Sequence, residues 1–247
     1  MKKIIFFDTE TTGNEPKKDF VCQLAFKTKD TPNEKGLTFC EFYKPLIAIP
    51  PEASAITHIT NKMVADKPLF KESGNYGMIK LLFEDSNSVA VAHNAKFDLA
   101  IIGKEGIVPS NFICTLRVAR ALDKENIIPQ YKLQYLRYYL DIEIEAEAHD
   151  ALGDVLVLEK LFDRLLAKIM KENNLSEDKA IERMIEISSK PSLMNIFNFG
   201  KHNGKTVIDV AKIDRNYLEW MLAQKEQNPD NEEDWIYTLK YYLGKLQ

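Results

Sequence analysis

Residues 4–13 read IIFFDTETTG, and this stretch decides how the rest of the chain is interpreted. Four apolar residues from Ile4 to Phe7 are typical of a buried strand, and two carboxylates follow them, Asp8 and Glu10. Side chains two positions apart on a strand point to the same face, so these carboxylates are expected side by side. Because their charges repel, a cation is expected to compensate them. Oxygen ligands favour a hard ion such as Mg²⁺ or Mn²⁺.

The Asp-x-Glu pair taken alone is a weak signal, because motifs this short recur by chance. Two acids at the end of a strand are also explained as solvated side chains before the turn at residues 11–13. A metal site therefore needs further ligands elsewhere in the chain.

Composition sets broad limits on the function. The chain has 247 residues, 45% of them hydrophobic and 28% charged, and a net charge of -4, which argues against a generally basic nucleic-acid binder. Its three cysteines, Cys22, Cys40 and Cys114, form no C-x-x-C pair and are expected as free thiols. The sequence shows neither a signal peptide nor a segment long enough to span a bilayer, so we expect a cytoplasmic protein without membrane contact.

Strand and helix patterns alternate along most of the chain, which predicts an α/β fold with a mixed sheet flanked by helices. Strand patterns occupy residues 2–7, 20–30, 37–45 and 88–94, and helix patterns occupy 73–86, 96–106, 133–144 and 150–173. An irregular segment at 49–60 opens a short helix, and residues 111–123 contain a strand-to-helix transition. In the helix at 73–86, the apolar spacing predicts that Met78, Leu81 and Leu82 face the core.

The helical pattern fades after residue 170, which predicts a domain boundary. We expect a first domain at 1–170, a linker helix at 171–192 that Pro191 ends, and a second module at 193–247. The segment YLEWML in this module predicts an apolar helix face with Trp220 in the core.

Further carboxylates follow the pattern of the first pair. Asp98 comes just after an apolar strand, near the start of a helix, and HDALGD places His149 and Asp154 five residues apart. Two residues that are five positions apart do not share one face of an α-helix. We therefore expect His149 in a loop, Asp150 as the N-cap and Asp154 in an early helical turn. Each residue has an ordinary explanation, since acids are favourable in a first helical turn and histidines are common in loops. Their combination with the strand pair is much less ordinary.

Three motifs together resemble a known superfamily. FDTETTG at 7–13, HNAKFD at 93–98 and HDALGD at 149–154 are similar to the three exonuclease motifs of the DnaQ-like 3′→5′ exonucleases, in the DEDDh branch whose fifth letter is His149. The segments at 56–68 and 190–222 resemble the exodeoxyribonuclease X group of that superfamily. One departure is visible, because many members carry His-Gly where this chain has Thr57-His58.

The resemblance implies an RNase H-like mixed sheet flanked by helices, with a small C-terminal α+β module. It implies metal-dependent hydrolysis at DNA 3′ ends, single- or double-stranded, that releases mononucleotides in DNA repair, with two Mg²⁺ or Mn²⁺ ions per site. By the resemblance, the metal ligands are Asp8, Glu10, Asp98 and Asp154, the general base is His149, and the residues that contact substrate are Thr9, Ile56, His58, Asn94 and Phe97. Phe97 also fits an ordinary core position, and a homodimer is compatible with the resemblance.

Other functions remain open at this point. RNA or short oligonucleotides are alternative substrates, as in the ribonuclease T and oligoribonuclease relatives, and a polymerase proofreading subunit is a second alternative. A non-catalytic nucleic-acid-binding module is disfavoured because all five motif residues are present.

The tail also contains GKHNGKT at residues 200–206, which superficially resembles a phosphate-binding loop. Only three residues separate its glycines, whereas a P-loop has four, so we do not predict an ATPase. A small basic turn with Lys201, His202 and Lys205, or an ordinary solvated turn, explains the segment.

Overall fold

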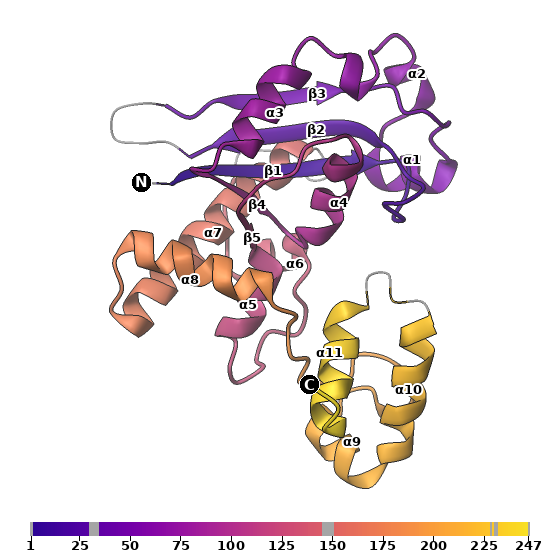
Figure 1. Ribbon diagram of the computed structural model, residues 1–247, viewed down its shortest axis with the longest axis vertical. Coiled ribbons are helices and arrows are strands. Elements are labelled where there is room, and N and C mark those ends of the chain that lie inside the picture. Colours follow the sequence, from indigo (N-terminus) through magenta and orange to yellow (C-terminus); the bar gives the residue numbers. More distant parts are fainter. Residues whose placement is uncertain (1, 30–34, 145–150, 228, 230–231, 247) are drawn as a thin grey trace. The chain divides into compact units, whose positions relative to one another are not determined.

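The computed structural model describes residues 2–29, 35–144, 151–227, 229 and 232–246. It divides into two compact units (Figure 1). The first comprises Met1–Ala119 and Gln130–Ser188, and the second comprises Arg120–Pro129 and Ser189–Gln247.

The first unit is built on a five-stranded mixed sheet in the order β3-β2-β1-β4-β5, which confirms the predicted α/β class. β1 pairs with β2 and β2 with β3 in antiparallel fashion, whereas β1–β4 and β4–β5 are parallel. β1 continues past its apolar half and includes both carboxylates. The strands are β1 Lys3–Thr11, β2 Val21–Thr28, β3 Thr38–Phe42, β4 Ser88–Ala92 and β5 Phe112–Cys114.

Alternate residues of β1 face two different layers of helices. The ring of Phe6 lies 5.2 Å from that of Phe162 on α7 (Ala151–Asn173). The ring of Phe7 lies 5.2 Å from that of Phe83 on α3 (Tyr76–Glu84), on the opposite face. Positions 8 and 10 therefore continue the α7 face, and position 9 continues the other.

The predicted buried face of α3 is wrong. Ile79 and Phe83 are buried, whereas Met78 is 40% and Leu81 is 77% exposed. Leu82 is partly buried against the core. The helix carries two overlapping apolar stripes, and the one with the aromatic ring packs onto the sheet because that ring removes more apolar surface from water.

Helix α8 (Glu177–Ser189), which falls in the predicted linker, packs within the first unit. The backbone N–H of Cys114 donates to Ser188 Oγ at 2.8 Å, and the Arg117 guanidinium donates to the Ser188 carbonyl at 2.9 Å. The remaining elements of this unit are α1 Pro51–Thr57, α2 Asn61–Val64, η1 Phe70–Glu72, α4 Lys96–Lys104, α5 Thr115–Leu122 and α6 Leu133–Tyr139. The three cysteines are free, as predicted.

The second unit consists of η2 Gly200–His202, α9 Val207–Ile213, α10 Arg215–Gln227 and α11 Glu233–Leu243. Within the described residues, the β part of the predicted α+β module is the single bridge between Ile196 and Thr206. Residues 120–129 belong to this unit: the Arg120 guanidinium pairs with Asp234 at 2.6 Å, and the Asn195 amide donates to Asn126 at 2.7 Å.

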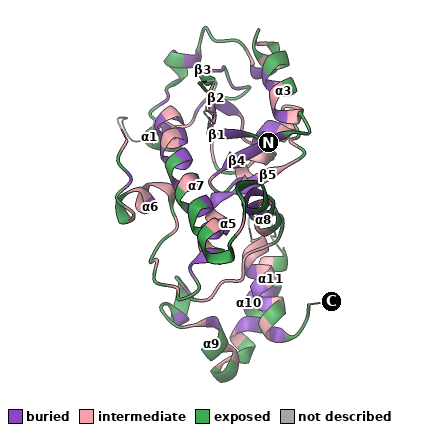
Figure 2. Cartoon of the chain, turned by 90° about the vertical axis from the view of Figure 1, so that its left-hand side faces the viewer, coloured by how far each residue is buried: buried purple, intermediate pink, exposed green. Residues whose placement is uncertain are grey.

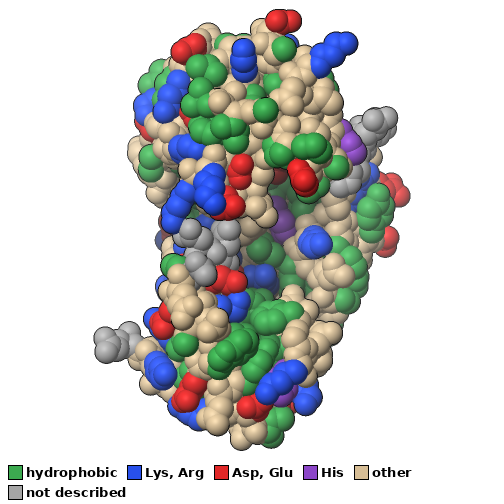
Figure 3. Space-filling model, turned by 90° about the vertical axis from the view of Figure 1, so that its right-hand side faces the viewer, with side chains coloured by type: hydrophobic (Ala, Val, Ile, Leu, Met, Phe, Trp, Pro, Cys, Tyr) green, Lys and Arg blue, Asp and Glu red, His purple; other side chains and the backbone are tan. Residues whose placement is uncertain are grey.

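The prediction that Trp220 lies in the core is wrong, because its side chain is 57% exposed. On α10 the buried stripe is Leu218, Met221 and Leu222, and Trp220 points away from it. Trp235 occupies the core instead, stacked on Phe197 at 5.1 Å. Hydrophobic side chains also reach the surface of this unit (Figure 3).

Among the described residues, no helix combines the length and the apolar character that crossing a membrane requires.

Candidate active site

Three carboxylates gather where β1 meets α7. One carboxylate oxygen from each of Asp8, Glu10 and Asp154 lies within 4.8 Å of the others, and all three residues are half-buried. The alternation of β1 sends the first two toward α7, and the first turn of that helix supplies the third. The structure thus brings together three of the four predicted metal ligands.

The fourth predicted ligand, Asp98, holds the strand between the two acids. The pairing of β1 with β4 ends at Phe6 and Val91. Beyond that point, Asp98 Oδ1 accepts from the backbone N–H of Thr9 at 3.1 Å and from its hydroxyl at 2.6 Å. Asp98 is buried in the first turn of α4, so this bond fixes α4 to the strand that carries Asp8.

The environment of this cluster disfavours the charged form of its buried carboxylates. Burial raises the pKa of Asp8 well above its usual range, and the charges of Asp98, Glu10 and Asp154 raise it further. Burial also raises the pKa of Asp98 to about 7, although the hydrogen bonds from Thr9 oppose the shift. Carboxylates held together in this way are stabilised as anions by a cation. The all-oxygen donor set suits a divalent hard ion, so the residues fit the expected metal.

Gln134 on α6 is a site residue that the sequence analysis missed. Its amide nitrogen donates to Asp154 Oδ1, while its own Oε1 is buried and has no hydrogen-bond partner among the described residues. In the sequence it is one polar residue in an amphipathic helix, and no motif marks it. Only the meeting of α6 and α7 reveals its contact with Asp154, a predicted metal ligand.

His93 connects three segments behind the site. Its Nδ1 lies 2.9 Å from the Thr115 hydroxyl, and its Nε2 lies 2.6 Å from the Tyr131 carbonyl. A carbonyl only accepts, so Nε2 carries the proton and donates to Tyr131. This bond holds the chain before α6 near the end of β4.

The predicted substrate-binding residues are divided between the surface and the core. Ile56 is 69% exposed on α1, and His58 is exposed at its C-cap with a φ of 58°. Asn94 is exposed with a φ of 63°, in the left-handed region that favours Gly and Asn. Phe97 is half-buried against the core, and Thr9 is buried with its hydroxyl bonded to Asp98. His149 and Asp150 lie outside the described residues.

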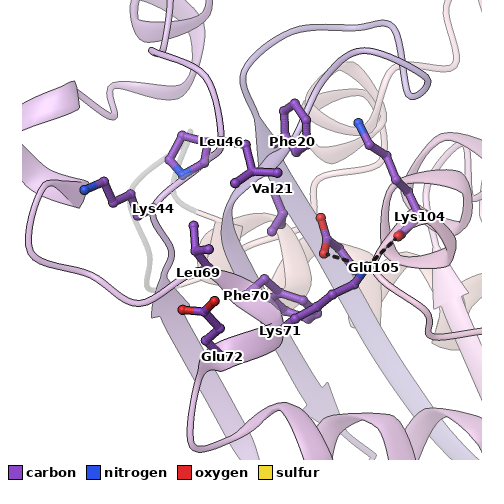
Figure 4. Close-up of a pocket in the computed structure, with 11 residues that line it drawn as sticks. Phe20, Val21, Lys44, Leu46, Leu69, Phe70, Lys71, Glu72, Lys104 and Glu105 are labelled. Carbon is purple, nitrogen blue, oxygen red and sulfur yellow. Dashed lines mark hydrogen bonds and ion pairs between the residues drawn. The ribbon is translucent and has the colours of Figure 1, made fainter.

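A separate cavity of about 260 Å³ has an apolar floor and a charged rim (Figure 4). Lys71 at this rim donates to the Lys104 carbonyl at 3.1 Å and lies 3.8 Å from Glu105. The ammonium of Lys104 lies 3.6 Å from the centre of the Phe20 ring. Three of the cavity's charged groups are therefore engaged with neighbouring residues.

Comparisons with known proteins identify the family of the chain. A family model described as Exonuclease matches residues 5–162, and one described as Exodeoxyribonuclease X-like C-terminal matches residues 197–226. The chain is 33% identical over 209 residues to exodeoxyribonuclease 10 of Escherichia coli K12, covering 81% of this chain and 82% of the relative. It is 32% identical over 194 residues to the DNA polymerase III subunit epsilon of Treponema pallidum, covering 73% and 86%.

Solved structures of exonucleases are similar to this chain in fold. The structure of exonuclease X in complex with 5′ overhanging duplex DNA is similar with a TM-score of 0.58 and 25% identity, covering 75% of this chain and 99% of that one. E. coli exonuclease I in complex with a dA16 oligonucleotide shares the fold, with a TM-score of 0.53 and 23% identity over 68% of this chain and 44% of that one. The exonuclease family depends on divalent metal ions. Since the family model matches more than half of the chain and exodeoxyribonuclease 10 is 33% identical over 81% of it, the chain belongs to the exonuclease family and is a 3′→5′ exonuclease.

Proposed function

We propose that this exonuclease removes mononucleotides from the 3′ ends of DNA with two Mg²⁺ or Mn²⁺ ions. The observation that carries the proposal is the cluster of Asp8, Glu10 and Asp154, whose carboxylate oxygens lie within 4.8 Å of one another. DNA is favoured over RNA because relatives at 33% and 25% identity are named as exodeoxyribonuclease 10 and as exonuclease X with duplex DNA.

In this proposal the protein residues divide the work of hydrolysis. The ions would supply charge that polarises the scissile phosphate and favours both the attacking and the leaving oxygen. Asp8, Glu10 and Asp154 would hold them, and Asp98 would complete the set while it fixes Thr9 and the strand. His149 would accept the proton of the attacking water, since an imidazole titrates near neutral pH. Ile56, His58, Asn94 and Phe97 would contact the terminal nucleotide.

The decisive experiment uses 3′-labelled single-stranded DNA, duplex DNA and RNA of matched length. We expect mononucleotides from DNA in Mg²⁺, no release in the presence of a chelator, and restored release when the ion is returned. His149→Ala is expected to slow hydrolysis by about 10²–10⁴-fold, the usual contribution of a general base. Release that persists in chelator, or a full rate in His149→Ala, would contradict the mechanism, and faster RNA cleavage would contradict the substrate.

Polymerase proofreading is a second candidate, because the epsilon subunit of Treponema pallidum is 32% identical to this chain. The match of residues 197–226 to the exodeoxyribonuclease X-like module favours a nuclease that acts without a polymerase. A purified chain that is fully active alone supports our proposal, whereas activity that requires an added polymerase catalytic subunit supports proofreading. A role in DNA repair, a cytoplasmic location and a homodimer are further parts of the proposal, and sedimentation tests the last.

A further inference from the structure

One side of α6 connects the carboxylate cluster with an exposed aromatic surface. Gln134 near the start of this helix donates to Asp154 Oδ1. Residues three and four positions later on a helix share its face, so Arg137 and Tyr138 lie on the side of α6 that carries Gln134. The helix rises about 1.5 Å per residue, which places Tyr138 roughly 6 Å farther along the axis than Gln134.

Helix α6 keeps its position along α7, so this surface stays beside the cluster. Its start contacts Asp154 through Gln134, and its end is held by Arg164 of α7, which donates to the carbonyls of Leu140 and Asp141. Only Leu136 of α6 is buried, and the rest of the helix is half-buried or exposed (Figure 2). The helix is therefore anchored at its two ends, while most of its surface between them is accessible.

The accessible surface next to Gln134 carries the chemistry that recognises a nucleic-acid strand. Tyr138 is 69% exposed, and the guanidinium of Arg137 lies 5.4 Å from the centre of its ring. None of the ion pairs among the described residues involves Arg137, whose side chain contacts the ring of Tyr138. The neighbouring Tyr135 and Tyr139 stack at 5.8 Å, which stiffens the helix surface. An exposed aromatic ring beside a cation is the usual platform for an unpaired base and its phosphate.

We infer that Arg137 and Tyr138 form a binding subsite for the substrate strand, in which Tyr138 stacks on a base upstream of the 3′ terminal nucleotide and Arg137 pairs with a backbone phosphate. This inference rests on the proposed function, since it assumes that the 3′ end lies at the carboxylate cluster. The subsite recognises aromatic bases in general, because a stacking platform reads no base edge. Its position one helical turn from Gln134 makes it a contact that only a chain longer than one nucleotide reaches.

The test compares a substrate that reaches the subsite with one that does not. Thymidine 5′-monophosphate p-nitrophenyl ester occupies only the terminal-nucleotide position, whereas an oligothymidylate extends along α6. For Tyr138→Ala we expect KM for the oligothymidylate to rise about tenfold or more, as the loss of one stacked base gives. Both kcat and KM for the ester should stay at the wild-type values. Tyr138→Phe keeps the ring and should restore KM.

Arg137→Ala should weaken oligothymidylate binding and lower the slope of log affinity against log salt by about 0.7, the contribution of one single-strand phosphate.

The matched control for Tyr138→Ala is Tyr241→Ala, because Tyr241 is a 51% exposed helical tyrosine of the second unit. A parallel change of KM on both substrates would mean that Tyr138 acts through Gln134 and the cluster, and would overturn the subsite. An unchanged KM on the oligothymidylate would also overturn it.

Binding of labelled oligothymidylate in Ca²⁺, followed by fluorescence anisotropy, separates this inference from the proposed function. If the wild type cleaves neither substrate, the proposed function fails, but weaker anisotropy binding in Tyr138→Ala still supports a nucleic-acid subsite. Equal binding by wild type, Tyr138→Ala and Tyr241→Ala would show that α6 does not hold the strand.

Discussion

Each unit of the molecule contains a cluster of polar side chains, and the two clusters differ in composition. One consists of acids alone, whereas the other pairs an acid with hydrogen-bond donors. In the first unit Asp8, Glu10 and Asp154 lie together, and burial and mutual repulsion raise the pKa of Asp8 well above its usual range. In the second unit Asp214 accepts from Lys201 at 2.6 Å and from His202 at 2.8 Å. These two bonds lower the pKa of Asp214 from 3.8 to about 2.

The difference separates a functional cluster from a structural one. The chain itself provides the Lys201 ammonium and the His202 ring N–H as donors to Asp214, so that acid is satisfied when the protein folds. The acids around Asp8 instead raise its pKa, so the group is favourable as a set of anions only when a cation comes from outside. Perturbed carboxylates of this kind are typical of functional sites, whereas the Lys201, His202 and Asp214 cluster holds η2 next to α9 and α10.

The largest effect is expected from Asp8→Asn. In our proposal Asp8 binds the metal directly. Its loss should therefore reduce hydrolysis by more than the roughly 100-fold that is lost when a residue hydrogen-bonded to a metal ligand is removed. In the metal-free protein the same change removes a destabilised charge, so Tm should rise by about 2–4 °C for each kcal/mol of repulsion relieved. Calorimetry in chelator and a nuclease assay in Mg²⁺ measure the two effects. A lower Tm in metal-free Asp8→Asn would contradict the idea that the cluster is incomplete by itself.

A smaller effect is expected from Gln134→Leu, which removes the hydrogen bond to Asp154 without altering any metal ligand. We expect affinity for Mn²⁺ to fall by about 10- to 100-fold, as is usual when a residue that hydrogen-bonds to a metal ligand and orients it is lost. Calorimetric titration of the metal-free protein with Mn²⁺ measures this directly. Gln224→Leu, at an exposed glutamine of α10, is the control, and equal affinities for the two variants would exclude a positioning role for Gln134.

The smallest effect is expected from Asp214→Asn, which weakens the completed cluster. Since the pKa of Asp214 is lower in the folded protein, its contribution to stability is full above the ordinary value of 3.8 and is lost as the pH falls toward about 2. The wild type should therefore lose stability of the second unit over this range, and the variant should be less stable at neutral pH but lose less on acidification.

Tryptophan fluorescence reports this unfolding selectively. The chain has two tryptophans, Trp220 and Trp235, and both belong to the second unit. Asp66→Asn, at an exposed aspartate of the first unit, is the control. Nuclease activity of Asp214→Asn should match the wild type at neutral pH. An identical acid unfolding transition in wild type and Asp214→Asn would contradict the expected contribution of Asp214 to the stability of the second unit.

The strands of the sheet and the positions of the clustered acids could be predicted from the sequence, because both depend on local patterns along the chain. The period of two on a strand places Asp8 and Glu10 together, and apolar runs bounded by turn residues mark the strands. The position of Asp154 in an early helical turn follows from its spacing within HDALGD. The motifs also identified Asp98, but its bond to Thr9 depends on where β4 stops pairing with β1, and no local pattern encodes that point.

The errors concern which of several faces a helix buries. In α3 the stripe of Ile79 and Phe83 and the predicted stripe of Met78, Leu81 and Leu82 both follow the helical period, so only packing against the sheet decides which one is buried. Trp220 stands next to the buried pair Met221 and Leu222 in sequence but lies about 100° from its neighbour on the helix. Gln134 has no motif at all, because its importance comes from the packing of two helices.

The assignment of residues 120–129 to the second unit limits how the molecule can be divided. The chain passes from one unit to the other after Ala119, after Pro129 and after Ser188. A single protease cut after Ser188 would leave Arg120 and Asn126 on the nuclease fragment, without the Asp234 and Asn195 to which they bind. A fragment that ends at residue 170 would in addition lack Ser188, which bonds Cys114 and Arg117. The two units are therefore distinct in space but interleaved in sequence, so exchange of the tail between relatives requires exchange of the short internal segment as well.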